Sequence, residues 1–490
     1  MSEYVLALDE GTTNAKAAAI GRDGRIIATA SRPLSTHHPA PAHVEQDPEI
    51  IWSALLSAAE ECIAKAGGAP NGIAISNQRE SVLAWDGTTG QAAAPLIGWQ
   101  DARTFAFCDE LRRHASATTS NNAEDLVRAR TGLHLDAMFS APKIRYLLDQ
   151  VTGSHTPGTT HTDTLRVGTV DTWLVSRLTG GAQYLAEAGN AGRTLLLNLD
   201  TQQWDPDLCA LFGIDPTLLA PIARSDAHFG VTANLGESIP DDIPIVAVLG
   251  DSHAALFGHG CHTPGHGKTT YGTGSSAMIA LGTTRPTNSA APTTLAWLTN
   301  QPFFALEGNI VATGTAMDWV ARTLGVKGGR ELDTLAATED SSGGVSFIPA
   351  FTGLGAPWWD REAVATLSGM TAATTRGHIA RAAVECVAHQ VADVIESFDA
   401  DLVSLRADGG ASRSPLLMQI QADLLGRPVT ASPVEEISLL GAALMGFASL
   451  GWEIPSIDEA GARTYSPQIS ADERDSRRAA WKEAIGRSRA

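Results

Sequence analysis

An apolar strand followed at once by a hydroxyl-rich turn stands near the start of the chain, where the sequence reads Val5-Leu6-Ala7-Leu8-Asp9-Glu10-Gly11-Thr12-Thr13-Asn14-Ala15-Lys16. The strand brings the carboxylate of Asp9 to its end, and Gly11 lets the backbone turn tightly against a ligand. Two threonine hydroxyls, backbone amides and Lys16 surround the same point, which suits a phosphate beside a hydrated metal ion. The pattern also fits an ordinary turn, so later segments must supply the rest of such a site.

Composition and charge restrict the class of protein. With 490 residues, 43% of them hydrophobic and 18% charged, the chain is expected to form two sizeable globular domains. The net charge of −19 disfavours binding to nucleic acid or to an anionic membrane. The five cysteines are scattered and never form a CxxC pair, which argues against a disulfide framework or a zinc site. Because the sequence shows neither a signal peptide nor an apolar run long enough to span a bilayer, the protein is predicted to be cytoplasmic.

The order of strands and helices indicates two α/β lobes. Short apolar strands are predicted at 5–9, 17–20, 26–30, 73–76 and 82–85, with a helix that begins at Pro48 and is capped by Asp47. A similar order returns later, with strands at 245–249 and 404–407, a strand region at 269–281 and helices at 379–398 and 416–425. We therefore expect two similarly built lobes around a cleft, with the boundary at 240–244. Segments 114–125, 152–164 and 284–296 are expected to be surface loops, and the polar tail after residue 456 is expected to be peripheral.

A second strand-end carboxylate, Asp251, follows the strand at 245–249 and opens a helix. It fits a helix N-cap. Two aspartates of this kind would also serve phosphoryl transfer, one near a metal–phosphate unit and one accepting a proton from an attacking hydroxyl. Glycine-rich turns at 271–276 and 407–414 would bring amides and hydroxyls close to phosphates or a nucleotide. No GxxxxGK[ST] motif is present, and no GxGxxG follows the first strand, so the common nucleotide-binding loop folds are not indicated.

Polar residues also follow the strand at 73–76, in the segment Asn77-Gln78-Arg79-Glu80. An Arg–Glu pair is usually a solvated surface pair, but at a strand end its two side chains can donate to and accept from neighbouring hydroxyls. Trp99 fits either a core residue or an aromatic face for the apolar edge of a polyol. These residues predict a hydroxyl-rich ligand next to the phosphate.

Together these motifs resemble the FGGY family of sugar and polyol kinases, and within it the glycerol kinases. The resemblance extends from residue 5 to about residue 452 and includes LALDEGTT, ISNQRESVLAWD, GWQDART, GDSHAALFGHG, TTYGTGS, FIPAFTGLGAPWWD and LRADGGASRSPLLMQIQADLLG. It implies an α/β fold of two actin-like (ribonuclease-H-like) ATPase domains with an interdomain cleft. The N-terminal domain, 1–244, would bind the polyol, and the C-terminal domain, 245–490, the nucleotide. It also implies transfer of the γ-phosphoryl group of ATP to a hydroxyl of a small polyol or sugar, with Mg²⁺ required.

The resemblance implies roles for individual residues as well. Asp251 matches the general base, and Asp9 matches the carboxylate that faces the hydrated Mg²⁺. The positions that match acceptor-binding residues are Arg79, Glu80, Trp99, Met138, Asp251, Ser252 and Ser276. The positions that match ATP-binding residues are Thr12, Thr13, Asn14, Lys16, Thr273, Gly314, Asp318, Gly410 and Ser414.

Three acceptor positions differ from a glycerol kinase in a way that predicts a roomier pocket. Met138 stands in place of a tyrosine, Ser252 in place of a glutamine and Ser276 in place of a phenylalanine. We therefore expect an acceptor somewhat larger than glycerol. A ketose kinase, for xylulose or ribulose, is an alternative, and so is a non-catalytic ATP-responsive sugar sensor. The expected partners are the small acceptor and ATP, without nucleic acid or stable membrane association. A homodimer or a homotetramer is left open.

Overall fold

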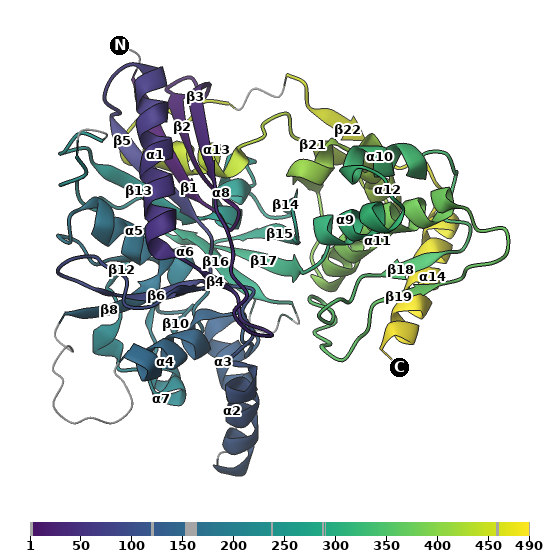
Figure 1. Ribbon diagram of the computed structural model, residues 1–490, viewed down its shortest axis with the longest axis horizontal. Helices are drawn as coiled ribbons and strands as arrows, with labels where there is room; N and C mark the ends of the chain where they lie inside the picture. Colours follow the sequence, from purple (N-terminus) through teal and green to yellow (C-terminus); the bar gives the residue numbers. More distant parts are fainter. Residues whose placement is uncertain are drawn as a thin grey trace.

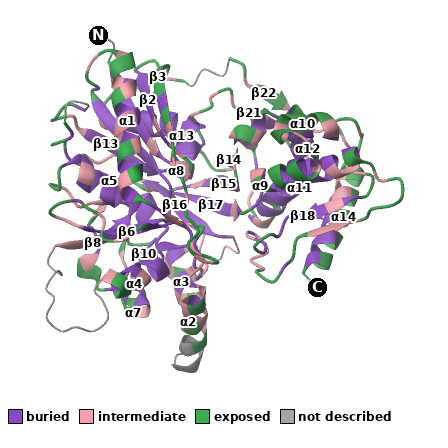
Figure 2. Ribbon diagram, viewed as in Figure 1, coloured by how far each residue is buried: buried purple, intermediate pink, exposed green. Residues whose placement is uncertain are grey.

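The computed structural model describes residues 3–118, 122–151, 164–236, 239–286, 289, 291–456 and 460–489. They form two α/β lobes, each built around a large β-sheet, with the N-terminal end on the first lobe and the C-terminal end on the second (Figure 1). The strands of both large sheets are mostly buried, as Figure 2 shows. The predicted α/β organisation is therefore confirmed.

The first sheet brings three strand ends to one edge. Its five strands lie in the order β13-β5-β1-β2-β3. Their bounds are β1 (Tyr4–Glu10), β2 (Asn14–Gly21), β3 (Ile26–Pro33), β5 (Gly72–Asn77) and β13 (Ile245–Gly250). Strand β1 is antiparallel to β2 and parallel to β5, and β13 is also parallel to β5. Asp9 in β1, Asn77 in β5 and Asp251 just after β13 therefore meet at the same edge of the sheet.

Strand β13 follows the predicted domain boundary at residue 244 and yet completes the first sheet. Strand β13 joins this sheet because it pairs with β5 in the folded protein, and no local feature of the sequence predicts that pairing. The assignment of polyol binding to 1–244 and of nucleotide binding to 245–490 stays a prediction.

The second sheet repeats the strand order of the first. Its strands, in spatial order, are β16 (Thr293–Leu298), β17 (Pro302–Ile310), β15 (Ser275–Gly282), β14 (His266–Tyr271), β20 (Ser404–Asp408), β21 (Val429–Ala431) and β22 (Arg463–Tyr465). Strand β14 is antiparallel to β15 and parallel to β20, as β1 is to β2 and β5. The segment β17-β15-β14-β20-β21 thus matches β3-β2-β1-β5-β13. The turn at 11–13 and the turn at 272–274 hold equivalent positions in the two lobes.

Two helices, α8 (Asp251–Gly258) and α13 (Ile437–Ser449), pack between the sheets. Their apolar side chains share one core with residues of β1, β5 and β13 on one side and of β15, β16 and β17 on the other. A Cβ atom on Gly441 of α13 would lie 1.8 Å from the carbonyl oxygen of Ala254, so only glycine permits this crossing. This close packing against α13 fixes the position of α8, and with it the position of Asp251, the first residue of α8.

The remaining elements surround these sheets. A four-stranded sheet contains β4 (Glu45–Gln46), β7 (Leu96–Ile97), β6 (Val82–Asp86) and β8 (Leu165–Thr169). Paired short strands are β9 (Ala186–Glu187) with β12 (Ile222–Ala223), β10 (Leu197–Asn198) with β11 (Gln203–Trp204), and β18 (Ser346–Ile348) with β19 (Thr366–Ser368). The other helices are α1 (Pro48–Ala66), α2 (Phe105–Thr118), α3 (Ala123–Thr131), α4 (Ser140–Val151), α5 (Val170–Leu178), α6 (Ala188–Ala191), α7 (Pro206–Phe212), α9 (Gly314–Thr323), α10 (Gly328–Ala336), α11 (Arg376–Ser397), α12 (Pro415–Leu425) and α14 (Ala471–Ser488), with the short 3₁₀ helices η1 (Pro216–Leu218) and η2 (Gly410–Arg413).

Some expected loops belong to regular elements. Helix α2 extends to Thr118 and α3 begins at Ala123, while β16 begins at Thr293. Alanines favour the continued helix, and the β-branched threonines at 293 and 294 favour a strand. The expected loops at 114–125 and 284–296 are therefore wrong in part. Residues 152–163 of the third expected loop lie outside the described residues.

The C-terminal tail is not peripheral, because α14 docks on the second lobe. Trp481 is buried, and its indole nitrogen donates a 2.7 Å hydrogen bond to Asp393 of α11. Arg478 forms an ion pair with the same aspartate. Throughout the described part of the chain, no helix combines the length and the apolar character that crossing a membrane requires.

Candidate active site

A cavity with a volume of about 440 Å³ lies between the two lobes. Nine predicted site residues line it: Thr12, Thr13, Arg79, Glu80, Trp99, Asp251, Ser252, Thr273 and Ser276. Gly274 and Ser275, which also line it, belong to the glycine-rich turn predicted at 271–276. The remaining lining residues were not predicted: Thr36, His38, Gln100, Thr270, Asn309 and Ile310. The two equivalent turns, after β1 and after β14, thus both border one cavity.

Two carboxylates lie at the shared edge of the first sheet. Asp9 accepts a 2.5 Å hydrogen bond from the hydroxyl of Ser76. Burial raises the pKa of Asp9 to about 6, the bond from Ser76 opposes this shift, and the negative charge of Asp251 adds to it. Asp251 is 42% exposed, so it is the more accessible acid. The negative charge of Asp251 thus acts on Asp9, and a divalent cation is stabilised near such a pair of acids.

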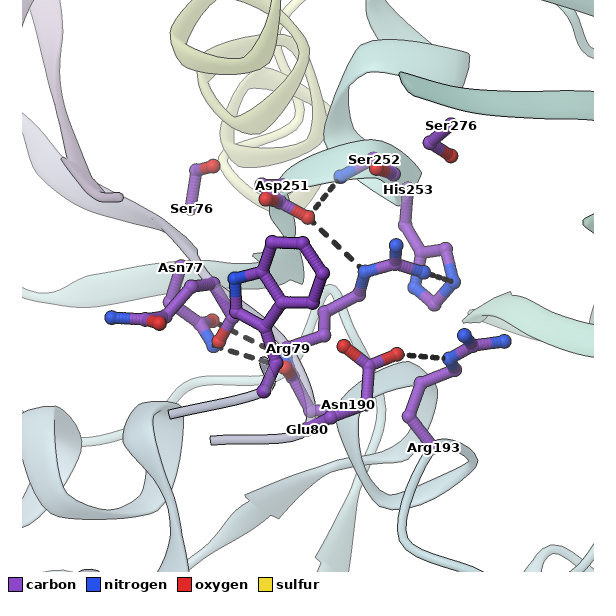
Figure 3. A network of polar contacts seen from close by, with 12 residues as sticks. Ser76, Asn77, Arg79, Glu80, Asn190, Arg193, Asp251, Ser252, His253 and Ser276 are labelled. Atoms are coloured by element: carbon purple, nitrogen blue, oxygen red, sulfur yellow. Dashed lines mark hydrogen bonds and ion pairs between the residues drawn. The ribbon is translucent and has the colours of Figure 1, made fainter. Parts of the chain in front are cut away.

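Arg79 is the centre of a buried ion-pair cluster that joins the lobes. Its Nη1 and Nη2 donate to the two carboxylate oxygens of Glu307 in β17, at 2.8 and 2.6 Å, and its Nε donates to Asp251 at 3.1 Å. Arg193, which follows α6, pairs with Glu80 at 2.5 Å and with Glu307 at 3.0 Å. Figure 3 shows Arg79 extending towards Asp251 and His253, with Glu80 turned towards Arg193. Two guanidinium groups and two glutamates thus pair in the buried part of this cluster, and the half-exposed Asp251 adds a third carboxylate at its edge.

Glu307 keeps its negative charge near neutral pH. Burial opposes ionisation of Glu307, but the positive charges of Arg193 and Arg79 outweigh it and hold the pKa of Glu307 well below its usual range. Burial, reinforced by the charge of Arg79, lowers the pKa of His253 far below its usual value. Nε2 of the neutral imidazole can therefore accept a 3.2 Å hydrogen bond from Nη1 of Arg79. Glu307 and His253 thus hold the guanidinium of Arg79 while its Nε contacts Asp251.

A hydrogen bond connects Trp99, a predicted acceptor-binding residue, to the turn at 11–13, which is predicted to hold phosphate. The indole nitrogen of Trp99 donates a 3.0 Å hydrogen bond to the hydroxyl of Thr12. Lys16, at the start of β2, forms a 2.7 Å ion pair with Glu436, the residue before α13. Lys16 thus anchors the chain that enters α13 in this structure.

Eight predicted site residues do not line the cavity: Asp9, Asn14, Lys16, Met138, Gly314, Asp318, Gly410 and Ser414. Met138 packs against a hydrophobic core of the first lobe. Gly314 contacts the second turn, because its amide donates a 3.0 Å hydrogen bond to the carbonyl of Gly272. Ser414 caps α12, and Asp318 is exposed on α9. Contacts of these residues with ATP or the acceptor stay predictions.

Glu10, next to Asp9, is a buried acid with no charged partner among the residues that the structure describes. One of its oxygens accepts a 2.7 Å hydrogen bond from Gln78, and the other has no partner among the described residues. Burial raises the pKa of Glu10 to about 8, despite the opposing hydrogen bond from Gln78. A raised pKa means that the folded state binds this proton more tightly than the unfolded state does. The contribution of Glu10 to stability is therefore full below its unfolded pKa and is lost as the pH rises to about 8.

Glu10→Gln is expected to remove this pH dependence. The amide keeps the shape of the protonated acid and cannot ionise, so the variant should gain roughly 2–4 kcal/mol of stability relative to the wild type between about pH 5 and about pH 9. Thermal midpoints of both proteins measured across that range check the prediction. A difference in midpoint that stays constant with pH would contradict it.

Sequence reasoning missed the buried charges that support the site. Glu307 lies in the otherwise apolar strand Phe303-Phe304-Ala305-Leu306-Glu307, and Lys268 lies in the buried strand β14. A charged residue inside an apolar strand could have indicated a buried ion pair, because buried charges require partners. The partners, Arg79 and Arg193, are distant in sequence and come together only through the fold.

The chain is similar to known proteins over nearly its whole length. Residues 4–258 match the N-terminal domain and residues 267–450 match the C-terminal domain of the FGGY family of carbohydrate kinases. The apulose kinase of Pectobacterium atrosepticum is 44% identical, over 91% of this chain and 90% of that protein. A glycerol kinase of Aromatoleum aromaticum is 41% identical, over 99% of each chain.

Solved structures agree with these relatives. The glycerol kinase of Plasmodium falciparum with ADP has a TM-score of 0.87 at 27% identity, over 99% of this chain and 98% of that one. The xylulose kinase of Rhodospirillum rubrum has a TM-score of 0.82 at 25% identity, over 99% of each chain. The predicted pair of actin-like ATPase domains is therefore confirmed. With both domain models matched and such relatives along its full length, the chain belongs to the FGGY family of carbohydrate kinases, which phosphorylate sugars and polyols with ATP.

Proposed function

We propose that this kinase transfers the γ-phosphoryl group of ATP to a hydroxyl of a sugar or polyol larger than glycerol, inside the cavity between the lobes. The observation that carries the proposal is the convergence of chemistry on one cavity. Asp251, the pair Arg79 and Glu80, and the two hydroxyl-rich turns all line it. Direct transfer requires an acid–base group, an oriented hydroxyl and a held phosphate at one point, and little other chemistry from the protein.

Asp251 is suited to act as the general base. Its Oδ1 accepts hydrogen bonds from Arg79 and from the amide of Ser252, which fix the carboxylate. Its Oδ2 has no hydrogen-bond partner among the described residues and is available for the proton of the attacking hydroxyl. Glu80, held by Arg193, would accept hydrogen bonds from other acceptor hydroxyls, and Trp99 would face the carbon chain.

The residues around Asp9 fit a hydrated Mg²⁺ bound with ATP. No cluster of three or more His, Cys, Asp or Glu side chains that could hold a metal occurs in the described part of the chain. Mg²⁺ commonly takes only one or two carboxylates and completes its shell with water and phosphate oxygens. When bound, Mg²⁺ would neutralise charge on the transferring phosphates. Thr12 and Thr13, in the turn after Asp9, would hold those phosphates through their amides and hydroxyls.

The lining of the cavity and one relative both support an acceptor larger than glycerol. Serines at 252 and 276 leave polar walls, and one relative at 44% identity is an apulose kinase. A ketose acceptor therefore remains the main alternative within this class. A non-catalytic sensor is disfavoured, because Asp251 lines the cavity and Asp9 lies at the same edge of the first sheet. Oligomeric state and cytoplasmic location stay predictions.

A panel of acceptors tests the proposal. The purified full-length chain with ATP and Mg²⁺ is expected to release ADP with at least about tenfold higher kcat/KM for a five-carbon sugar or polyol than for glycerol. The panel contains glycerol, erythritol, xylulose, ribulose and apulose, assayed by coupled ADP release. Glycerol as the best substrate would contradict the proposed acceptor. ADP release that does not depend on any acceptor would contradict the kinase mechanism itself.

A further inference from the structure

Two buried charged groups lie directly behind the hydroxyl of Ser276. Ser276 is in β15 and lines the cavity, and its Oγ donates to Oε1 of Glu307 at 3.3 Å. Oγ of Ser276 also accepts a hydrogen bond from Nζ of Lys268 at 3.4 Å. Lys268 is fully buried and Glu307 is 1% exposed. Figure 3 shows Ser276 on the same side of Asp251 as Ser252. The wall at Ser276 is thus backed by a charged layer that water does not reach.

Lys268 is itself held in place by a second hydroxyl. Its Nζ donates to Oγ1 of Thr270 at 3.1 Å, and that hydroxyl donates in turn to Asp408 at 3.1 Å. Thr270 also lines the cavity. The ammonium group therefore points towards two cavity hydroxyls, whose protons are directed to the buried carboxylates of Glu307 and Asp408.

The hydrogen bonds of Ser276 leave one position open. A serine hydroxyl has one proton and two lone pairs. Its proton is directed to Glu307 and one lone pair to Lys268, so one lone pair remains to accept a hydrogen bond from the cavity. An apolar carbon against this oxygen would desolvate it without replacing its hydrogen bond with water, which is unfavourable. A hydroxyl group of the acceptor is the complementary partner.

We infer that Ser276 is a specificity-determining residue that accepts a hydrogen bond from an acceptor hydroxyl which glycerol lacks. The inference rests on the proposed function and names its substrate class: polyols and sugars with at least one hydroxyl beyond the three of glycerol. Lys268 and Glu307 fix the orientation of the Ser276 hydroxyl, so the subsite is preorganised before the acceptor binds.

Removal of the single hydroxyl tests the inference. In Ser276→Ala, the ratio of kcat/KM for xylulose to kcat/KM for glycerol is expected to fall about tenfold below the wild-type ratio, because only the longer acceptor loses a partner. Apulose serves as a second long acceptor. Ser276→Thr keeps the hydroxyl on a strand that tolerates β-branched residues, and it should keep the ratio within about threefold of the wild type.

A neighbouring serine provides the matched control. Ser275 also lines the cavity, but its hydroxyl donates to Thr313 at 3.0 Å, so Ser275→Ala removes the same group from the same strand and leaves the contacts of Ser276 in place. Its xylulose-to-glycerol ratio should stay near that of the wild type. If Ser276→Ala lowers kcat/KM equally for all acceptors, or not at all, the subsite is overturned while the proposed function stands. If the wild-type protein phosphorylates no acceptor longer than glycerol, the proposed acceptor and the subsite both fail.

Discussion

Asp251→Asn is expected to lower kcat by about three orders of magnitude while ATP binding changes little. Asparagine keeps the size of the side chain and can still accept the hydrogen bond from Arg79, but it cannot take the proton of the attacking hydroxyl. Loss of a general base typically costs a factor of about 10²–10⁴ in rate. Coupled ADP release with the best acceptor measures kcat, and calorimetric titration with ATP measures binding. Similar losses in kcat and kcat/KM would assign the effect to the transition state.

An aspartate that does not line the cavity provides the control. Asp47 caps α1 by accepting hydrogen bonds from the amides of Glu49 and Ile50. Asparagine is as good a helix cap as aspartate, so Asp47→Asn makes the same chemical change without consequence for the helix. The control should retain kcat within about twofold of the wild type. Near-normal turnover of Asp251→Asn would refute the assignment of the base, and a base elsewhere in the cavity would then have to be sought.

The fold was accessible from the sequence because its signals are local. Strand β1 at Tyr4–Glu10 agrees with the predicted strand at 5–9 to within a residue at each end, and helix α1 (Pro48–Ala66) begins at the predicted proline. Apolar runs, a capping aspartate and a proline at the first helical position mark these elements without any knowledge of their neighbours. The ends of strands could be located for the same reason, and the polar residues at or just after them include Asp9, Arg79 and Asp251.

Features that depend on tertiary pairing were not accessible in this way. Helix α14 has a polar sequence, yet Trp481 and Arg478 find buried partners on α11. Glu307 stands in an apolar strand, and its role follows only from the arginines that the fold brings to it. Met138 matched an acceptor position by resemblance, and its partly buried side chain packs against a core of the first lobe, so its contact with the acceptor stays a prediction. Residue type and order predict what can occur at a strand end, but three-dimensional packing decides which side chains face the cavity.

Glu307→Gln is expected to destabilise the protein and to weaken acceptor binding at the same time. Glu307 is the shared carboxylate between Arg79 and Arg193, both nearly fully buried. Breaking a buried ion pair by removing one partner costs about 3–5 kcal/mol, because a buried charge is left without compensation. Arg79 would then lose its bidentate anchor, and with it the orientation of its Nε towards Asp251. The acceptor KM is expected to rise at least about tenfold, with a smaller change in the KM for ATP.

A second buried ion pair separates the two effects. Arg478 and Asp393 are 5% and 1% exposed, and they join α14 to α11 in the second lobe, apart from the residues that line the cavity. Asp393→Asn should lower the free energy of unfolding to a similar extent but leave the acceptor KM near the wild-type value. Chemical denaturation and steady-state kinetics on both variants measure the two quantities. If Glu307→Gln destabilised the protein as Asp393→Asn does and left the acceptor KM unchanged, Glu307 would only stabilise the lobes. The expected rise in KM confined to Glu307→Gln would show that a carboxylate of the second sheet positions the arginine that the first sheet presents to the acceptor.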